Sequence, residues 1–275
     1  MKNYSILYQE STIHYSITGK GFPVMLLHGF GEDSRVWSNQ IDHLADQFTL
    51  IVPDIPGSGK SDRLTGINSM EAYAKCINAI LEKEGIGRLL MIGHSMGGYI
   101  TLAFQEMYPE KLISFGLFHS SAFADDEAKK EARSKSIDFI QANGAQAFLK
   151  TSIPGLFMNP EKSEADIQLL LEQGKTFSKE ALISYYEAMI ARPDRTDLLK
   201  KATVPVLIIA GEHDKAVPYE HSLKQSHMPP NCSFNVLRNS AHMGMLEQTE
   251  ASNLILANFL QNCVINGATA DSILR

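Results

Sequence analysis

Compact apolar runs alternate with amphipathic segments along most of the chain. The runs predict buried strands at 24–27, 49–52, 89–92, 112–118, 206–209 and 233–237, preceded by strands at 6–8 and 13–17. Helical spacing of apolar residues predicts helices over 37–44, 98–108, 219–227 and 250–260. Asn68, with Glu71 three residues later, predicts the cap of another helix. This order predicts an α/β fold in which a mostly parallel, doubly wound sheet is covered on both faces.

The alternation is interrupted between residues 122 and 199, where helical segments occur without a convincing strand. Because strands precede and follow it, this block is interpreted as an insertion into a single domain spanning residues 1–275. An insertion at this point lies at the carboxyl edge of the sheet, where open α/β folds bind their ligands. A helical lid over a binding site is therefore expected, and a purely structural cap is the alternative.

Composition narrows the class of protein. The 275 residues are 44% hydrophobic and carry a net charge of −6, without any Lys/Arg-rich run. These values are typical of a soluble monomer or homodimer, and they argue against nucleic acid or a membrane as partner. The start of the chain lacks the apolar segment of a signal peptide. Cys76, Cys232 and Cys263 are far apart, which indicates free thiols and a cytoplasmic location.

One short motif carries candidate chemistry. Gly93-His94-Ser95-Met96-Gly97 matches G-x-S-x-G and lies between the predicted strand 89–92 and the predicted helix 98–108. A serine on a sharp strand-to-helix turn presents its hydroxyl above the end of the sheet, and the flanking glycines leave room for that turn. The alternative is a glycine-rich turn with an inert serine.

A serine hydroxyl becomes a nucleophile only when an oriented base removes its proton. Two residues that follow strands can supply this base and its acidic partner. Asp214 closes Gly211-Glu212-His213-Asp214 after strand 206–209, and His242 follows strand 233–237. The order Ser95, Asp214, His242 is that of the α/β hydrolases.

With these motifs in order, the chain resembles the α/β-hydrolase superfamily, in its lidded serine esterase and lactonase branch. The resemblance covers about residues 11–260. It rests also on His28-Gly29-Phe30-Gly31, on the D-x-x-G-x-G-x-S turn at 54–61, and on Ala241-His242. It implies that Ser95 is the nucleophile, His242 the general base and Asp214 its acidic partner. The backbone N–H groups of Phe30 and Met96 are expected to form the oxyanion hole.

The expected reaction is hydrolysis of a small or medium uncharged carboxylic ester or lactone through an acyl-enzyme, without a cofactor. The net acidic charge offers no attraction for anions. The expected pocket is made of apolar side chains of the helical block: Phe123, Phe148, Phe157, Met158, Tyr185 and Met189. No metal is expected, because the histidines lack H-x-x-H and H-E-x-x-H spacing.

Other reactions use the same triad. A C–C bond hydrolase and a perhydrolase share these motifs. A lyase resembling the menaquinone-pathway enzymes would also need arginines for an anionic substrate, and the candidates are Arg35, Arg133, Arg192 and Arg195. A non-catalytic ligand receptor on the same fold is the alternative outside enzymes. His28 and His94 are interpreted as structural residues.

Overall fold

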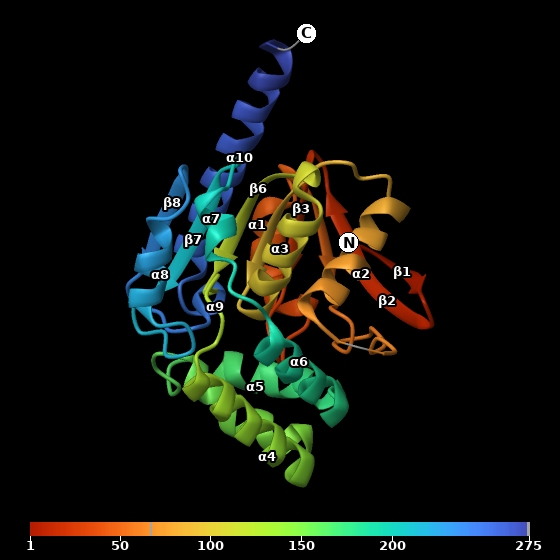
Figure 1. Cartoon of the computed structure of the whole chain (residues 1–275), viewed down its shortest axis with the longest axis vertical. Coiled ribbons are helices and arrows are strands. Elements are labelled where there is room, and N and C mark those ends of the chain that lie inside the picture. The colour runs from red at the N-terminus through yellow and green to blue at the C-terminus, as the bar shows by residue number, and fades with distance from the viewer. Residues whose placement is uncertain (67, 274–275) are drawn as a thin grey trace.

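A computed structural model describes residues 1–66 and 68–273, with side chains as far as residue 265. At its centre is an eight-stranded sheet in the order β1-β2-β4-β3-β5-β6-β7-β8 (Figure 1). The strands are β1 (Lys2–Tyr8), β2 (Ser11–Gly19), β3 (Phe22–Leu27), β4 (Phe48–Pro53), β5 (Leu89–His94), β6 (Leu112–Phe118), β7 (Val206–Gly211) and β8 (Cys232–Leu237). Strand β2 is antiparallel to both β1 and β4, and the strands from β4 to β8 pair in parallel. The mostly parallel sheet predicted from the sequence is confirmed.

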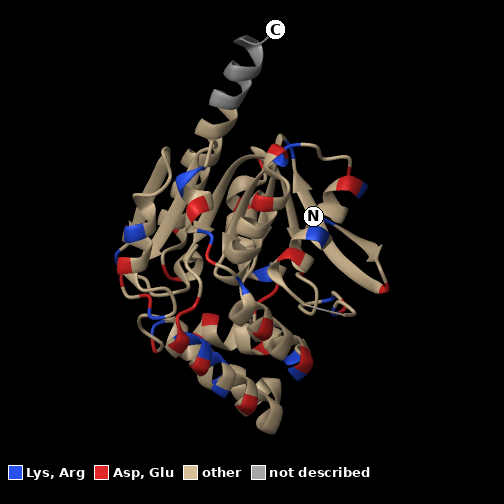
Figure 2. Ribbon diagram, viewed as in Figure 1, with Lys and Arg blue, Asp and Glu red and all other residues tan. Residues whose placement is uncertain are grey.

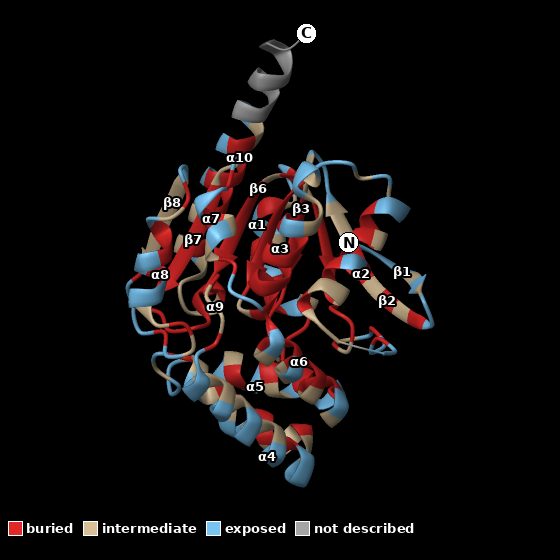
Figure 3. Cartoon of the chain, in the orientation of Figure 1, coloured by how far each residue is buried: buried red, intermediate tan, exposed pale blue. Residues whose placement is uncertain are grey.

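Helices cover both faces of this sheet. Helices α2 and α3 pack against each other on one face, and α1 and α10 pack against each other on the opposite face (Figure 1). Their bounds are α1 (Ser38–Leu44), α2 (Met70–Lys83), α3 (Met96–Met107), α8 (Tyr219–Ser226), α9 (Gly244–Glu247) and α10 (Thr249–Ile273). Because both faces are covered, every residue of β5 is buried, which explains its continuous apolar sequence (Figure 3).

The helix starts differ from the sequence prediction in two places. Helix α2 is capped by Ser69 rather than Asn68, because the Ser69 hydroxyl accepts the N–H of Ala72 at 3.1 Å. Glu71 consequently lies inside the first turn and pairs with Arg195 instead of completing a capping box. Helix α3 begins at Met96, directly after the G-x-S-x-G serine, and not at residue 98.

The segment between β6 and β7 is helical, as its sequence predicts. It contains α4 (Glu127–Ser152), α5 (Glu164–Gln173), α6 (Lys179–Ala191) and α7 (Thr196–Lys200). Helix α4 packs on α6, and it is kinked at Gly144, whose φ of +82° suits glycine. Figure 3 shows exposed outer faces on these helices.

Hydrogen bonds attach this helical block to loops that follow sheet strands. The Tyr185 hydroxyl donates to the carbonyl of Pro56 at 2.8 Å. The carbonyl of Leu156 accepts the N–H of His242 at 2.9 Å. The block therefore lies over the carboxyl edge of the sheet. Within the described part of the chain, no helix is both long and apolar enough to cross a membrane.

Candidate active site

Ser95 lies on a strained turn between β5 and α3, with φ +50° and ψ −114°. The turn brings backbone segments so close that side chains would not fit. A Cβ on Gly93 would lie 2.3 Å from the carbonyl carbon of Gly97, and a Cβ on Gly97 would lie 2.5 Å from the carbonyl oxygen of Leu27. The Ser95 N–H donates to the backbone carbonyl of Phe118 in β6 at 2.9 Å. The glycines of the motif are thus required by sterics, and strain of this kind is typical of functional sites.

Ser95, His242 and Asp214 form a continuous line of hydrogen bonds. The Nε2 atom of His242 lies 2.9 Å from the Ser95 Oγ, and its Nδ1 atom lies 2.8 Å from Oδ2 of Asp214. An ionised carboxylate only accepts hydrogen bonds, so Nδ1 carries the imidazole proton and Nε2 accepts from the serine hydroxyl. This tautomer is the one that can take a proton from Ser95.

Asp214 is held as a carboxylate in a buried position. Burial by itself raises its pKa, but the charge and hydrogen bond of His242 outweigh burial and lower the pKa to about 2. The other oxygen, Oδ1, accepts the N–H groups of Ala216 and Val217 at 2.8 and 2.9 Å. Glu212, the other carboxylate of this loop, is exposed.

A second histidine, His119, lies behind this carboxylate. It follows β6 with a φ of +48° and is fully buried. Its Nε2 accepts the N–H of Gly244 at 3.2 Å, while its Nδ1 lies 3.6 Å from Oδ2 of Asp214. Burial lowers the pKa of His119 well below its ordinary value against the opposing effect of Asp214, so the ring is neutral and its proton is on Nδ1, facing the carboxylate. The sequence assigned His119 no role, although like Asp214 it lies in a loop that follows a strand.

His94 and Glu32 form a buried pair beside the nucleophile. His94 Nδ1 lies 3.0 Å from Oε2 of Glu32, and His94 Nε2 lies 2.9 Å from the backbone carbonyl of His242. Because both ring nitrogens face acceptors, the ring is doubly protonated. Glu32 also accepts the N–H of Gly29 at 2.8 Å. The pair therefore connects the loop after β3, the Ser95 turn and the His242 loop, which is more than the packing role expected for His94.

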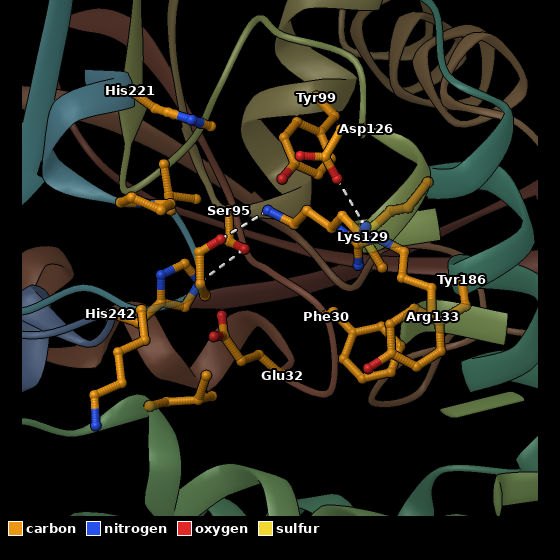
Figure 4. A pocket seen from close by; sticks show the side chains of 16 residues that line it. Phe30, Glu32, Ser95, Tyr99, Asp126, Lys129, Arg133, Tyr186, His221 and His242 are labelled. Atoms are coloured by element: carbon orange, nitrogen blue, oxygen red, sulfur yellow. Dashed lines mark hydrogen bonds between the residues drawn. The ribbon is translucent and has the colours of Figure 1, made fainter. Parts of the chain in front are cut away.

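A cavity of about 460 Å³ opens above Ser95 (Figure 4). It lies between the Ser95 turn, the loop after Asp214 and the helical block. Its walls combine apolar and charged side chains: Phe30, Glu32, Tyr99, Asp126, Lys129, Arg133, Leu156, Tyr186, Met189, Lys215, Ala216, Val217, Pro218, His221 and His242. The volume suits a small or medium substrate.

The expected pocket residues are mostly not in this cavity. Met189 lines it, but Phe148 packs edge-on against Phe30 behind the wall, and Tyr185 is buried with its hydroxyl on Pro56. The other three are also absent from its lining: Phe157 is buried, Met158 is 45% exposed, and Phe123 packs beside His221 and lines a neighbouring pocket. Apolar side chains of the block hold the helices together and onto the core, and these five residues do not line this cavity.

Of the arginines weighed for an anionic substrate, Arg133 lines the cavity. Arg192 is buried next to it and pairs with Asp125. The other two are engaged away from the cavity, Arg195 with Glu71 and Glu106 and Arg35 with Asp33.

The two backbone groups expected to bind an oxyanion belong to different loops. Phe30 follows β3, and its ring lines the cavity and lies 4.4 Å from the Tyr186 ring. Met96 is the first residue of α3, where N–H groups have no acceptor within the helix and the helix dipole favours negative charge. The described residues include no group of three or more His, Cys, Asp or Glu side chains arranged to hold a metal ion.

Comparison with known proteins agrees with this architecture. Residues 23–249 match the family model of the alpha/beta hydrolase fold. The chain belongs to this family. A solved α/β-hydrolase relative, a malate-bound thermophilic esterase from Thermogutta terrifontis, is 28% identical, with a TM-score of 0.88 over 96% of this chain and 99% of that one. An enol-lactonase from Burkholderia xenovorans has the same fold at 20% identity, with a TM-score of 0.86 over 94% of this chain and all of that one.

Curated relatives of this α/β hydrolase include hydrolases that are named for other substrates. A 2-hydroxy-6-oxononadienedioate/2-hydroxy-6-oxononatrienedioate hydrolase of Paraburkholderia phymatum is 27% identical over 91% of both chains. A 2-hydroxy-6-oxo-6-phenylhexa-2,4-dienoate hydrolase of Burkholderia cepacia is 26% identical over 91% of both chains. The chain is thus similar to hydrolases of more than one substrate class.

The Glu32–His94 pair makes stability depend on pH. Burial opposes both charges, but each partner stabilises the other, so the pKa of His94 is raised above 6.5 and that of Glu32 is lowered below 4.5. The contribution of His94 to the free energy of unfolding is therefore complete below 6.5 and is lost as the pH rises through the raised pKa. The contribution of Glu32 is complete above 4.5 and is lost as the pH falls through the lowered pKa.

We expect thermal melts from about pH 4 to about pH 9 to test this pair. Relative to a Glu32→Gln/His94→Asn double variant, the wild type should gain most stability between pH 4.5 and 6.5. A stability difference that stays constant across this range would contradict a buried ion pair.

Proposed function

We propose that this chain is a serine hydrolase that cleaves small or medium carboxylic esters or lactones through an acyl-enzyme on Ser95. The observation that carries the proposal is the line of hydrogen bonds from Asp214 through His242 to Ser95 at the base of the cavity. The esterase from T. terrifontis, similar along almost its whole length, supports an ester as the substrate class.

In the first half of the reaction, His242 Nε2 accepts the Ser95 proton as Oγ attacks the substrate carbonyl. The N–H groups of Phe30 and Met96 donate to the oxyanion of the tetrahedral intermediate. The protonated His242 then gives its proton to the leaving alcohol, and Asp214 stabilises the imidazolium without taking a proton. In the second half, His242 activates a water molecule that releases the acid and regenerates Ser95.

Hydrolysis of a C–C bond is the second candidate, favoured by the names of the two curated relatives. The two candidates differ in the substrate consumed. A p-nitrophenyl ester tests the first, and a vinylogous diketone tests the second. An enzyme that cleaves only the diketone would replace the ester proposal by the C–C proposal.

The helical block from residue 122 to residue 199 is proposed to act as a mobile lid. Its outer faces are exposed, and segments of this kind open more readily than a buried strand. We expect amides of α4 and α5 to exchange with deuterium at least about tenfold faster than those of β5. Equal protection in the block and in β5 would indicate a rigid cap.

Ser95→Ala should abolish hydrolysis of p-nitrophenyl butyrate, because no other group replaces the nucleophile. A fluorophosphonate probe should label the wild type and the matched control Ser134→Ala, whose serine is exposed on α4, but not Ser95→Ala.

The wild type should cleave the acetate or butyrate ester faster than the palmitate ester, because the cavity measures only about 460 Å³. Unchanged turnover by Ser95→Ala would refute the nucleophile, and a preference for palmitate would refute the substrate size.

A further inference from the structure

One wall of the cavity is formed by cationic side chains of the helical block. Lys129 and Arg133 lie one turn apart on α4, and both line the cavity (Figure 4). Figure 2 shows that α4 carries charges of both signs along its length, so the sequence alone marks no single cationic face. Lys129 and Arg133 differ from other cationic residues of α4 because they line the cavity. Lys135, on the same helix, instead has a side chain that is 73% exposed.

The charges beside this wall do not balance. Asp125 is buried and is shared by two guanidinium groups, Arg133 Nε at 2.6 Å and Arg192 Nη2 at 2.9 Å. Lys129 Nζ donates to the backbone carbonyl of Ala216 at 2.8 Å, and within the described residues its charge has no carboxylate partner. Two guanidinium groups thus share one buried carboxylate, and Lys129 adds a third positive charge to the wall.

The remaining acidic groups of the cavity do not restore the balance. Glu32 is already paired with His94. Asp126 is exposed to solvent, and its Oδ1 accepts the backbone N–H of Lys129 at the start of α4. Lys215, also on the lining, is exposed like Asp126 and balances its negative charge. The cavity is therefore net positive although the whole chain carries a charge of −6.

Tyr99 lies within the field of these cations. Its ring lies under the Arg192 guanidinium, with 3.9 Å between the guanidinium carbon and the ring centre. Burial raises the pKa of a phenol, yet the charges of Arg192, Lys129 and Arg133 lower the pKa of Tyr99 below its ordinary value. An anion placed beside Tyr99 would be stabilised in the same way.

The side chains of this wall also carry N–H groups that are available as hydrogen-bond donors. In the part of the chain that the structure describes, the two Nη groups of Arg133 have no hydrogen-bond partner, and the Lys129 ammonium uses one of its three N–H bonds. A guanidinium with free Nη groups can donate to a carboxylate, and charge-assisted hydrogen bonds of this kind are strong.

We propose that Lys129 and Arg133 bind a carboxylate of the substrate, so that the preferred substrate is an ester or lactone that carries an ionised carboxylate apart from the bond that is cleaved. This inference rests on the proposed acyl transfer at Ser95 and refines its substrate class. The sequence led us to expect an uncharged substrate from the net charge, but a local field, not the net charge, acts on a group inside a cavity.

A matched pair of esters tests the proposal. Mono-p-nitrophenyl adipate and p-nitrophenyl hexanoate have the same leaving group and chain length, and they differ by a terminal carboxylate in place of a methyl group. We expect the wild type to favour the adipate monoester by about tenfold or more in kcat/KM. Lys129→Gln and Arg133→Gln should each lower this ratio, mainly by raising KM for the adipate monoester. Lys135→Gln, the matched control, should keep the wild-type ratio.

Arg133→Gln leaves Asp125 with one partner and can impair folding, so Lys129→Gln and Arg133→Lys provide the second measurement. Arg133→Lys keeps the charge and should retain part of the preference. A wild type that favours the hexanoate ester, or that shows no preference, would overturn the carboxylate proposal while leaving the proposed hydrolase intact. Hydrolysis of neither ester, together with an unlabelled Ser95, would instead overturn the proposed function.

Discussion

The strained turn at Ser95 is the constraint on which the rest of the site depends. A φ of +50° is costly for a serine, and the turn persists because β5 is fixed between β3 and β6 and because Gly93 and Gly97 remove the side chains that would collide. The same geometry places Oγ within 2.9 Å of His242 and puts the first N–H groups of α3 beside it. Fold and chemistry are therefore linked through one residue.

Buried charge then fixes the three loops around that turn. Asp214 accepts from two backbone N–H groups and from His242, and neutral His119 faces it from behind. Glu32 and His94 form a separate buried pair that reaches the backbone of His242. Because an unpaired charge in this environment is costly, each loop is held in register by its partners. The cationic wall of α4 differs, since part of its charge has no carboxylate partner among the described residues.

The sequence predicts the sheet well because each central strand is buried on both faces, so its composition alone marks it. The order of Ser95, Asp214 and His242 is likewise readable, because each residue lies in the loop or turn that follows a strand and parallel strands end at one edge. In contrast, the lining of the cavity was not predictable from hydrophobicity. An amphipathic insertion can turn either face to the core, and here Phe148 and Tyr185 pack inward while Lys129 and Arg133 of α4 line the cavity. The role of Glu32 depends on contacts between distant loops, and such contacts leave no pattern in the local sequence.

The line of hydrogen bonds from Asp214 to Ser95 is most directly tested by comparing two carboxylate variants of one loop. Asp214→Asn removes the charge that fixes the His242 tautomer, whereas Glu212→Gln changes an exposed neighbour. With p-nitrophenyl butyrate as substrate, we predict that kcat falls by roughly 10⁴-fold in Asp214→Asn and stays near the wild-type value in Glu212→Gln. A larger loss in Glu212→Gln than in Asp214→Asn would contradict this account.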